Sequence, residues 1–191
     1  MIKQAIIPLA GLGTRLLPLT SVFAKELLPI NGKPGIEYIL DECIEAGIKE
    51  VVFIISKKKE MIKKYFYNDI FYKKILRKKK DLRIKEEYKK ILKYKKMIKF
   101  VYQNKPLGTG DAVLKTKKFI KSKYFLMLLP DDLIIKQNCS KSMIKVHNQY
   151  KSSVMASMNV PKKTVTRWGI YKLKKELNKK NYLIEKVIEK P

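Results

Sequence analysis

Lys3-Gln4-Ala5-Ile6-Ile7-Pro8-Leu9-Ala10-Gly11-Leu12-Gly13-Thr14-Arg15 joins a short apolar run to a loop that contains two glycines. The apolar run predicts a buried strand, and the loop behind it would leave the sheet at the carboxyl end of that strand. Ligands of open α/β sheets bind at this edge. The segment therefore predicts both an α/β fold and the position of a binding site.

The residues that follow extend this plan. Apolar residues between 36 and 44 recur at helical spacing and end at Ala46-Gly47, which is typical of a helix C-cap. Val51-Val52-Phe53-Ile54-Ile55 then predicts a second buried strand. A strand, a helix and a strand in this order form a βαβ unit with parallel pairing. We therefore expect an α/β fold with a mostly parallel, mixed central sheet flanked by helices.

The rest of the chain shows no linker, so residues 1–191 are predicted to form a single domain. Between Lys57 and about Lys96 the period is helical and Gly and Pro are absent, which predicts one or two basic surface helices without identifiable chemistry. Further strands are expected at 98–103 and 124–129, helices at 111–119 and through Met143 and Val146, and two short β pieces around 169–171 and 182–188.

The net charge of +27, from 44 Lys and Arg against 17 Asp and Glu, raises the question of an anionic partner. Nucleic acid and an anionic membrane are the usual partners of such a charge. Here the charge is nearly all lysine and is spread over most of the chain, whereas arginine, which phosphate recognition favours, is scarce. This pattern is typical of solvated helix faces. Neither a membrane nor nucleic acid is therefore an expected partner.

The cysteines and the histidine point away from redox and histidine-based chemistry. Cys43 and Cys139 lie far apart in segments predicted to be helical, so no disulfide framework is expected and a cytoplasmic location is predicted. His147 is the single histidine and falls on the polar face of a predicted helix. This position favours a structural or solvated role over a catalytic triad or a histidine metal site.

The loop 10–15 and Lys25 suit the phosphates of a nucleotide. Glycines let backbone N–H groups approach a polyphosphate, and an arginine and a lysine neutralise its charge. The pattern is neither a P-loop nor a dinucleotide fingerprint, because Leu16 stands where a third glycine would be required. Taken alone, the two glycines would equally suit an ordinary strand-to-loop turn.

Two further groups add polar chemistry after predicted strands. Asp131 and Asp132 offer the oxygen ligands that Mg²⁺ prefers beside phosphates, although paired aspartates also cap helices. The amide of Gln103 can donate and accept hydrogen bonds at once, so it can pair with the imide edge of a pyrimidine. The simpler interpretation is a strand-end side chain followed by a turn at 106–110.

In their order, these blocks resemble the signature of the sugar-1-phosphate nucleotidylyltransferases. The resemblance covers nearly the whole chain and rests on Gly-Leu-Gly-Thr-Arg at 11–15, Lys-Glu-Leu-Leu-Pro at 25–29, Pro-Leu-Gly-Thr-Gly-Asp-Ala-Val at 106–113, Trp-Gly-Ile-Tyr at 168–171 and Glu-Lys-Pro at 189–191. It implies a Rossmann-like nucleotidyltransferase fold and Mg²⁺ as the cofactor.

The resemblance also implies roles for the matching residues. The loop would wrap the nucleotide, two basic residues would act on its phosphates, one carboxylate would bind the metal, and the last blocks would hold the sugar phosphate. The nucleotide-binding residues would be Ala10, Gly11, Leu12, Gly13 and Thr14, with Gln103 and Gly108 at the base. The catalytic residues would be Arg15 and Lys25, and the metal ligand would be Asp131. The residues that hold the sugar phosphate would be Gly169, Glu189 and Lys190.

Within the family, the chain is most similar to the bacterial UTP:glucose-1-phosphate uridylyltransferases, through the 11–15 loop and Asp-Glu-Cys-Ile-Glu-Ala-Gly-Ile at 41–48. This implies attack of glucose 1-phosphate on the α-phosphate of UTP, which yields UDP-glucose and pyrophosphate, in a homo-oligomer. A thymidylyl or cytidylyl relative stays open, as does a non-catalytic nucleotide- or nucleic-acid-binding remnant.

The chain departs from the family pattern in two places. Residues 20–26 lack a lysine and a proline of the pattern, which bears on the rigidity of the loop. Full members continue beyond the position of Pro191 with further sheet and much of the dimer surface. The chain is therefore expected to be an incomplete nucleotidyltransferase domain.

Overall fold

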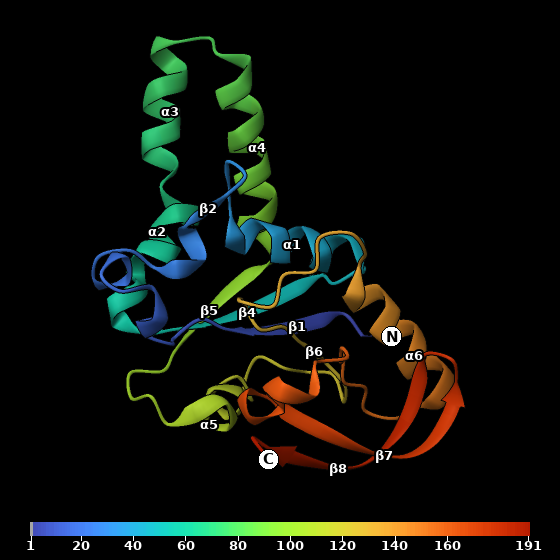
Figure 1. Cartoon of the computed structure of the whole chain (residues 1–191). Coiled ribbons are helices and arrows are strands. Elements are labelled where there is room, and N and C mark those ends of the chain that lie inside the picture. Colours follow the sequence, from blue (N-terminus) through green and yellow to red (C-terminus); the bar gives the residue numbers. More distant parts are fainter. Residues whose placement is uncertain (1) are drawn as a thin grey trace. The chain divides into compact units, whose positions relative to one another are not determined.

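The computed structural model describes residues 2–191 and divides them into two compact units, one that ends at Val154 and one over Met155–Pro191. The first unit contains β1 (Gln4–Pro8), β2 (Pro29–Ile30), β3 (Lys33–Pro34), α1 (Gly35–Glu45), β4 (Glu50–Ile55), α2 (Glu60–Tyr67), α3 (Asp69–Lys78), α4 (Leu82–Met97), β5 (Ile98–Tyr102), α5 (Gly108–Lys115), β6 (Leu126–Met127) and α6 (Cys139–Tyr150), and the second contains β7 (Gly169–Asn178) and β8 (Asn181–Glu189) (Figure 1).

The centre of the first unit is a parallel sheet with the strand order β5-β4-β1-β6 (Figure 1). The pairing of β1 with β4 sets Ile6 opposite Val52, and the pairing of β4 with β5 sets Phe53 opposite Phe100. The predicted α/β class and parallel pairing are confirmed. Crossover connections through helices explain why neighbouring strands run in the same direction.

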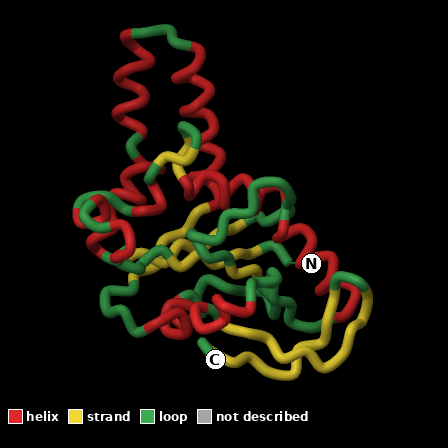
Figure 2. Tube along the Cα trace, in the orientation of Figure 1, coloured by secondary structure: helices red, strands yellow, loops and turns green. Residues whose placement is uncertain are grey.

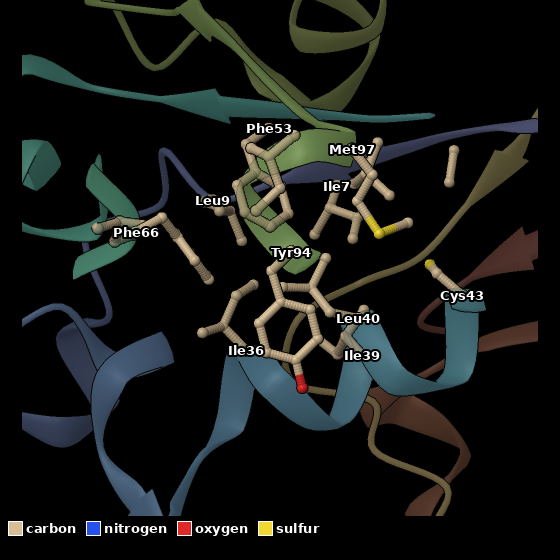
Figure 3. Packing of buried hydrophobic residues seen from close by; sticks show 14 of the residues in the cluster. Ile7, Leu9, Ile36, Ile39, Leu40, Cys43, Phe53, Phe66, Tyr94 and Met97 are labelled. Carbon is tan, nitrogen blue, oxygen red and sulfur yellow. The ribbon is translucent and has the colours of Figure 1, made fainter. Parts of the chain in front are cut away.

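Helices cover both faces of this sheet because alternate side chains of a strand point to opposite sides. Ala5, Ile7 and Leu9 belong to the large core cluster, which also contains residues of α1, α2 and α4. Ile6 and Ile54 instead pack against Ala112 of α5. Figure 3 shows the larger cluster, where side chains from α1 and α4 meet those of β1 and β4.

The first helix follows its predicted pattern. Ile36, Ile39, Leu40 and Cys43 of α1 are fully or nearly fully buried, and Ile44 is partly buried. The helix ends at Glu45, and Gly47 follows its C-cap residue at φ +80°, a backbone conformation that favours glycine. The buried Tyr94 of α4 donates its hydroxyl to Oδ1 of the half-buried Asp41 in α1 at 2.6 Å. This bond satisfies the polar group that the aromatic ring carries into the core.

The basic segment from 57 to 97 differs from its prediction, because it forms three α-helices instead of one or two. The breaks lie at Asn68 and Asp81, whose side chains cap α3 and α4 by accepting from the backbone N–H of Phe71 and Ile84. α3 and α4 form a hairpin that extends away from the sheet (Figures 1 and 2). The buried residues of this hairpin, Ile91, Tyr94 and Met97, lie in the last half of α4.

Smaller differences concern the ends of elements. α5 begins at Gly108, three positions before the predicted helix, and ends at Lys115 because the chain turns at Thr116, whose hydroxyl donates to Val113 O at 2.6 Å. The strand expected at 124–129 is only two residues long. His147 lies in α6 and is buried, with Nδ1 2.7 Å from Ser152 O and its ring beside Tyr124. Its surroundings support the predicted structural role.

The second unit is built on an antiparallel ribbon of β7 and β8, with register shifts along its length. Both strands extend beyond the two short β pieces that the sequence predicts. Among the described helices of the chain, we find none with the length and apolar character that a membrane span requires.

Candidate active site at the carboxyl edge of the sheet

Three loops leave the same edge of the parallel sheet. The backbone continues the ladder at each exit: Leu9 N–H donates to Ile54 O at 2.7 Å, Gln103 N–H to Ile55 O at 2.9 Å, and Leu128 N–H to Ile6 O at 3.1 Å. The glycine loop after β1, the loop after β5 and the loop after β6 therefore all begin at the carboxyl edge. This is the edge at which α/β sheets bind their ligands.

Gly13 holds the turn of the glycine loop. It has φ +69° and precedes the short 3₁₀ turn Thr14–Leu16, while the Thr20 hydroxyl donates to its carbonyl oxygen at 2.9 Å. A Cβ at this position would lie 3.1 Å from Thr20 Cγ2 and 3.5 Å from Lys25 Cδ. Both the backbone conformation and the space therefore favour glycine, and Lys25 passes directly beside the loop.

Gly11 has a different role, because a Cβ there would meet no described atom within 4 Å. The residue is exposed, as are Leu12 and Thr14, whereas Ala10 is half-buried. The backbone of the loop is thus open to solvent at Gly11. The glycine at this position suits the close approach of a ligand to the backbone.

Lys25 and Asp131 form the centre of the site. Lys25 begins a 3₁₀ turn, Lys25–Leu27, and its Nζ lies 3.0 Å from Asp131 Oδ2 in the loop after β6. The Lys25 side chain is 21% exposed and that of Asp131 is 60% exposed. The structure thus brings a predicted phosphate ligand and the predicted metal ligand into contact beside Gly13.

The charges around Asp131 favour its ionised form. Partial burial would raise the pKa of the carboxyl, but the hydrogen bond and charge of Lys25, with the charge of Arg15, lower this pKa below its usual value. Arg15 is itself exposed. The predicted residues Gly13, Arg15, Lys25 and Asp131 therefore gather in one electrostatic environment that combines two cations with one carboxylate.

A buried ion pair lies directly behind this centre and was not assigned from the sequence. Lys59 Nζ contacts Glu26 Oε1 at 2.7 Å and Oε2 at 2.8 Å, and the two side chains are 8% and 1% exposed. Burial lowers the pKa of Lys59 against the opposing effect of Glu26, and the charge of Lys25 lowers it further. Because Glu26 follows Lys25 directly, this pair fixes the backbone from which Lys25 extends.

Gln103 and Gly108, the predicted base ligands, also lie together. The Gln103 amide nitrogen donates to Gly108 O at 3.0 Å and to Asp111 Oδ2 at 2.7 Å. Gly108 has φ +88°, which favours glycine, and a Cβ there would meet no described atom within 4 Å. Gln103 is 6% exposed, so its orientation is set by these contacts.

The three predicted sugar-phosphate ligands lie together in the second unit. Gly169 pairs with Glu189 in the ribbon, and a Cβ on Gly169 would lie 3.1 Å from Glu189 Oε2. Lys190 has φ +48° and donates its backbone N–H to Trp168 O at 3.0 Å. Its Nζ is 3.8 Å from Glu189 Oε1. One end of the ribbon thus presents a cation and a carboxylate on an unusual backbone conformation.

The described side chains do not form a metal site of their own. Within residues 2–191, we find no group of three or more His, Cys, Asp or Glu side chains arranged to hold a metal ion. Asp131 and its neighbour Asp132 are exposed and offer carboxylate oxygens only. Such a donor set fits a magnesium ion that keeps water and phosphate oxygens as its other ligands.

The sequence profile of the Nucleotidyl transferase family matches residues 4–191. A protein from Methanocaldococcus jannaschii is 38% identical over the whole of this chain, and the match covers 66% of that protein. The UTP--glucose-1-phosphate uridylyltransferase of Mycoplasma pneumoniae is 39% identical over 88% of this chain, and the match covers 58% of that protein. The chain therefore spans two thirds or less of the length of these curated relatives.

Solved structures share this architecture. The UTP-bound UGPase from Acinetobacter baumannii superposes with a TM-score of 0.91 at 31% identity, and covers the whole chain, which spans 68% of that structure. A UDP-glucose pyrophosphorylase complexed with UDP-glucose gives a TM-score of 0.83 at 30% identity, with the whole chain and 70% of that structure covered. These similarities confirm the predicted nucleotidyltransferase fold.

Proposed function

This chain belongs to the Nucleotidyl transferase family, and from that membership we propose that it is the nucleotide-binding part of a UTP:glucose-1-phosphate uridylyltransferase. The observation that carries the proposal is the contact between Lys25 and Asp131 beside the turn at Gly13. A cation for phosphate and a carboxylate for a metal are thereby held at the edge where the glycine loop is open.

The uridylyl reaction is favoured over its relatives by two observations. Relatives named for UTP and glucose 1-phosphate are 33–39% identical to the chain, whereas a glucose-1-phosphate thymidylyltransferase structure at 20% identity shares only the fold. The polar side chain beside Gly108 is an amide, which can pair with the imide edge of uracil. Thymine presents the same edge, so the choice of UTP over dTTP rests on the sequence identities alone.

The proposed reaction is an in-line displacement on phosphorus. An oxygen of glucose 1-phosphate attacks the α-phosphorus of UTP, the bond to the β-phosphate oxygen breaks, and pyrophosphate leaves. Lys25 and Arg15 would offset the negative charge that gathers on the phosphates, and the backbone at Gly11 would lie against them. Positioning and charge compensation supply most of the catalysis in such reactions.

Two further ligand assignments belong to this proposal. Asp131 would hold Mg²⁺ together with phosphate oxygens, and the ion would supply charge neutralisation when bound. Glu189 would bind sugar hydroxyls and Lys190 the sugar phosphate, with Gly169 leaving room for Glu189. We also propose a cytoplasmic location, which is consistent with the two free cysteines.

The test is the release of pyrophosphate by the whole chain from UTP and Mg²⁺, with and without glucose 1-phosphate. The proposal predicts release that depends on the sugar phosphate and that yields UDP-glucose in equal amount. CTP and dTTP serve as the competing nucleotides. A preference for either of them over UTP would contradict the uridylyl assignment, and no release with any of the three would contradict a catalytic role.

A further inference from the structure

The amide of Gln103 is held by two groups that can only accept hydrogen bonds. Its nitrogen lies 3.0 Å from the carbonyl oxygen of Gly108 and 2.7 Å from Oδ2 of Asp111. A carbonyl and an ionised carboxylate have no hydrogen to donate. If the amide were reversed, its oxygen would face two other oxygens at hydrogen-bond distance. The chemistry of the partners therefore fixes which end of the amide is nitrogen.

Burial makes this orientation persistent. Gln103 is 6% exposed, and its backbone N–H is bonded to Ile55 O at 2.9 Å at the end of β5. Asp111 lies in the first turn of α5, where a negative charge is stabilised by the helix dipole. The two donors of the Gln103 amide are thus both occupied by its own loop and helix. The amide oxygen is the atom that the side chain can offer to a ligand.

We infer that Asp111 fixes the direction of the Gln103 amide and thereby makes the site select a pyrimidine that carries a hydrogen on N3. This inference rests on the proposed function, in which Gln103 reads the base. Uracil has an N3–H that donates to an amide oxygen, whereas cytosine has an unprotonated N3 that accepts. An amide oxygen facing the cytosine N3 would leave two acceptors in opposition. Asp111 acts here as a positioning residue that does not touch the nucleotide.

Two variants of Asp111 test the inference: Asp111→Asn replaces one carboxylate oxygen by an amide nitrogen, and Asp111→Glu adds one methylene. In Asp111→Asn, the new amide can donate to the oxygen of Gln103, so only the carbonyl oxygen of Gly108 still opposes a turn of Gln103 that presents its nitrogen to the N3 of cytosine. Asp111→Glu keeps an acceptor that can hold Gln103 in its present direction. Lys115 contacts the other oxygen of Asp111 at 3.6 Å, so Lys115→Gln is a matched control that alters the same carboxylate without removing it.

The experiment measures the dissociation constants of UTP and of CTP by calorimetric titration of the whole chain in the presence of Mg²⁺. The unmodified chain is expected to bind UTP more tightly than CTP. Asp111→Asn should reduce the ratio of the two constants by about tenfold, the size expected when one polar contact no longer discriminates. Asp111→Glu and Lys115→Gln should retain most of the ratio.

The ratio separates selectivity from stability, because damage to α5 would weaken the binding of both nucleotides together. An Asp111→Asn variant that keeps the full preference for UTP would overturn the inference and leave the proposed function intact. An unmodified chain that binds UTP and CTP equally would also overturn it. A chain that binds neither nucleotide would contradict the proposed function itself, and the inference would fall with it.

Discussion

The ammonium group of Lys25 lies 3.0 Å from a carboxylate oxygen of Asp131, although the two residues are 106 positions apart in the chain. The contact exists because β1 and β6 are neighbours in the parallel sheet, so the loops that follow them leave the same edge. It joins one residue suited to phosphate with one suited to a metal.

Replacement of Lys25 should impair turnover far more than stability. Lys25→Met retains the aliphatic stem beside Gly13 but removes the charge, and should lower the rate of pyrophosphate release by about 10²–10³, as the loss of one charge-stabilising donor does elsewhere. Lys58 is an exposed lysine in the turn after β4, so Lys58→Met is the control and should leave the rate within about twofold, as substitution of a solvated surface charge does. Equal rates in the two variants would remove Lys25 from the proposed machinery.

The acid titration of Asp131 should depend on Lys25. Since the folded protein lowers the pKa of this carboxyl, the interaction contributes stability above the unfolded-state pKa, and the contribution is lost as the pH falls through the folded-state pKa. Carboxyl-carbon NMR should show Asp131 titrating below the usual range in the native chain. In Lys25→Met the titration should move to higher pH. An unchanged midpoint would show that Lys25 does not hold the carboxylate in solution.

The buried pair of Glu26 and Lys59 should be intolerant of single substitutions. Glu26→Gln leaves the buried ammonium of Lys59 without its counter-charge, which should cost about 3–5 kcal/mol of unfolding free energy in urea. The double variant Glu26→Leu with Lys59→Met removes both charges and should be clearly more stable than Glu26→Gln. If Glu26→Gln unfolded at the same urea concentration as the native chain, the pair would not be buried as the structure describes.

The two glycines of the loop should respond differently to alanine. Gly13→Ala places a Cβ 3.1 Å from Thr20 Cγ2 on a backbone with φ +69°, which should destabilise the fold by about 1–2 kcal/mol. Gly11→Ala meets no described atom within 4 Å, so thermal unfolding should change little. UTP binding by Gly11→Ala should nevertheless weaken, because the methyl group occupies the space of the ligand. Unimpaired UTP binding by Gly11→Ala would place the phosphates elsewhere.

The thiol of Cys43 should be inert in the native chain. Burial, with a smaller effect of Glu42, raises its pKa to about 12, so at pH 8 almost none of it is the reactive thiolate. A disulfide reagent at that pH should modify Cys43 only after denaturation. Cys139, whose pKa is also raised but which is partly exposed, should react first. Rapid native modification of Cys43, identified by mass spectrometry, would contradict its burial in α1.

Much of this architecture was predictable because local patterns and chain order agree. The apolar runs of β1 and β4 and the helix between them require parallel pairing, and the polar residues that follow strands must then meet at one edge. Gly13, Lys25 and Asp131 could be assigned to one site for that reason. Their resemblance to a known family supplied the roles, which composition and spacing alone left open.

Other features depend on tertiary contacts that no local pattern marks. Lys59 stands in a run with Lys57 and Lys58, and only the position of the turn after β4 determines which of the three is buried against Glu26. The breaks at Asn68 and Asp81 were missed because capping by these side chains replaces the glycine or proline that usually ends a helix. Asp111 has the pattern of an ordinary helix-start residue, and only the fold brings it into contact with Gln103.

The α3–α4 hairpin has a consequence for how this sequence can change over generations. No residue of α3 is fully buried, although Tyr72 packs against the core. The buried residues of the hairpin all lie in the last half of α4. Mutations in the outer part therefore escape the constraints that packing imposes on the sheet. Lysines can accumulate there, and the hairpin can lengthen or shorten, at little cost to folding.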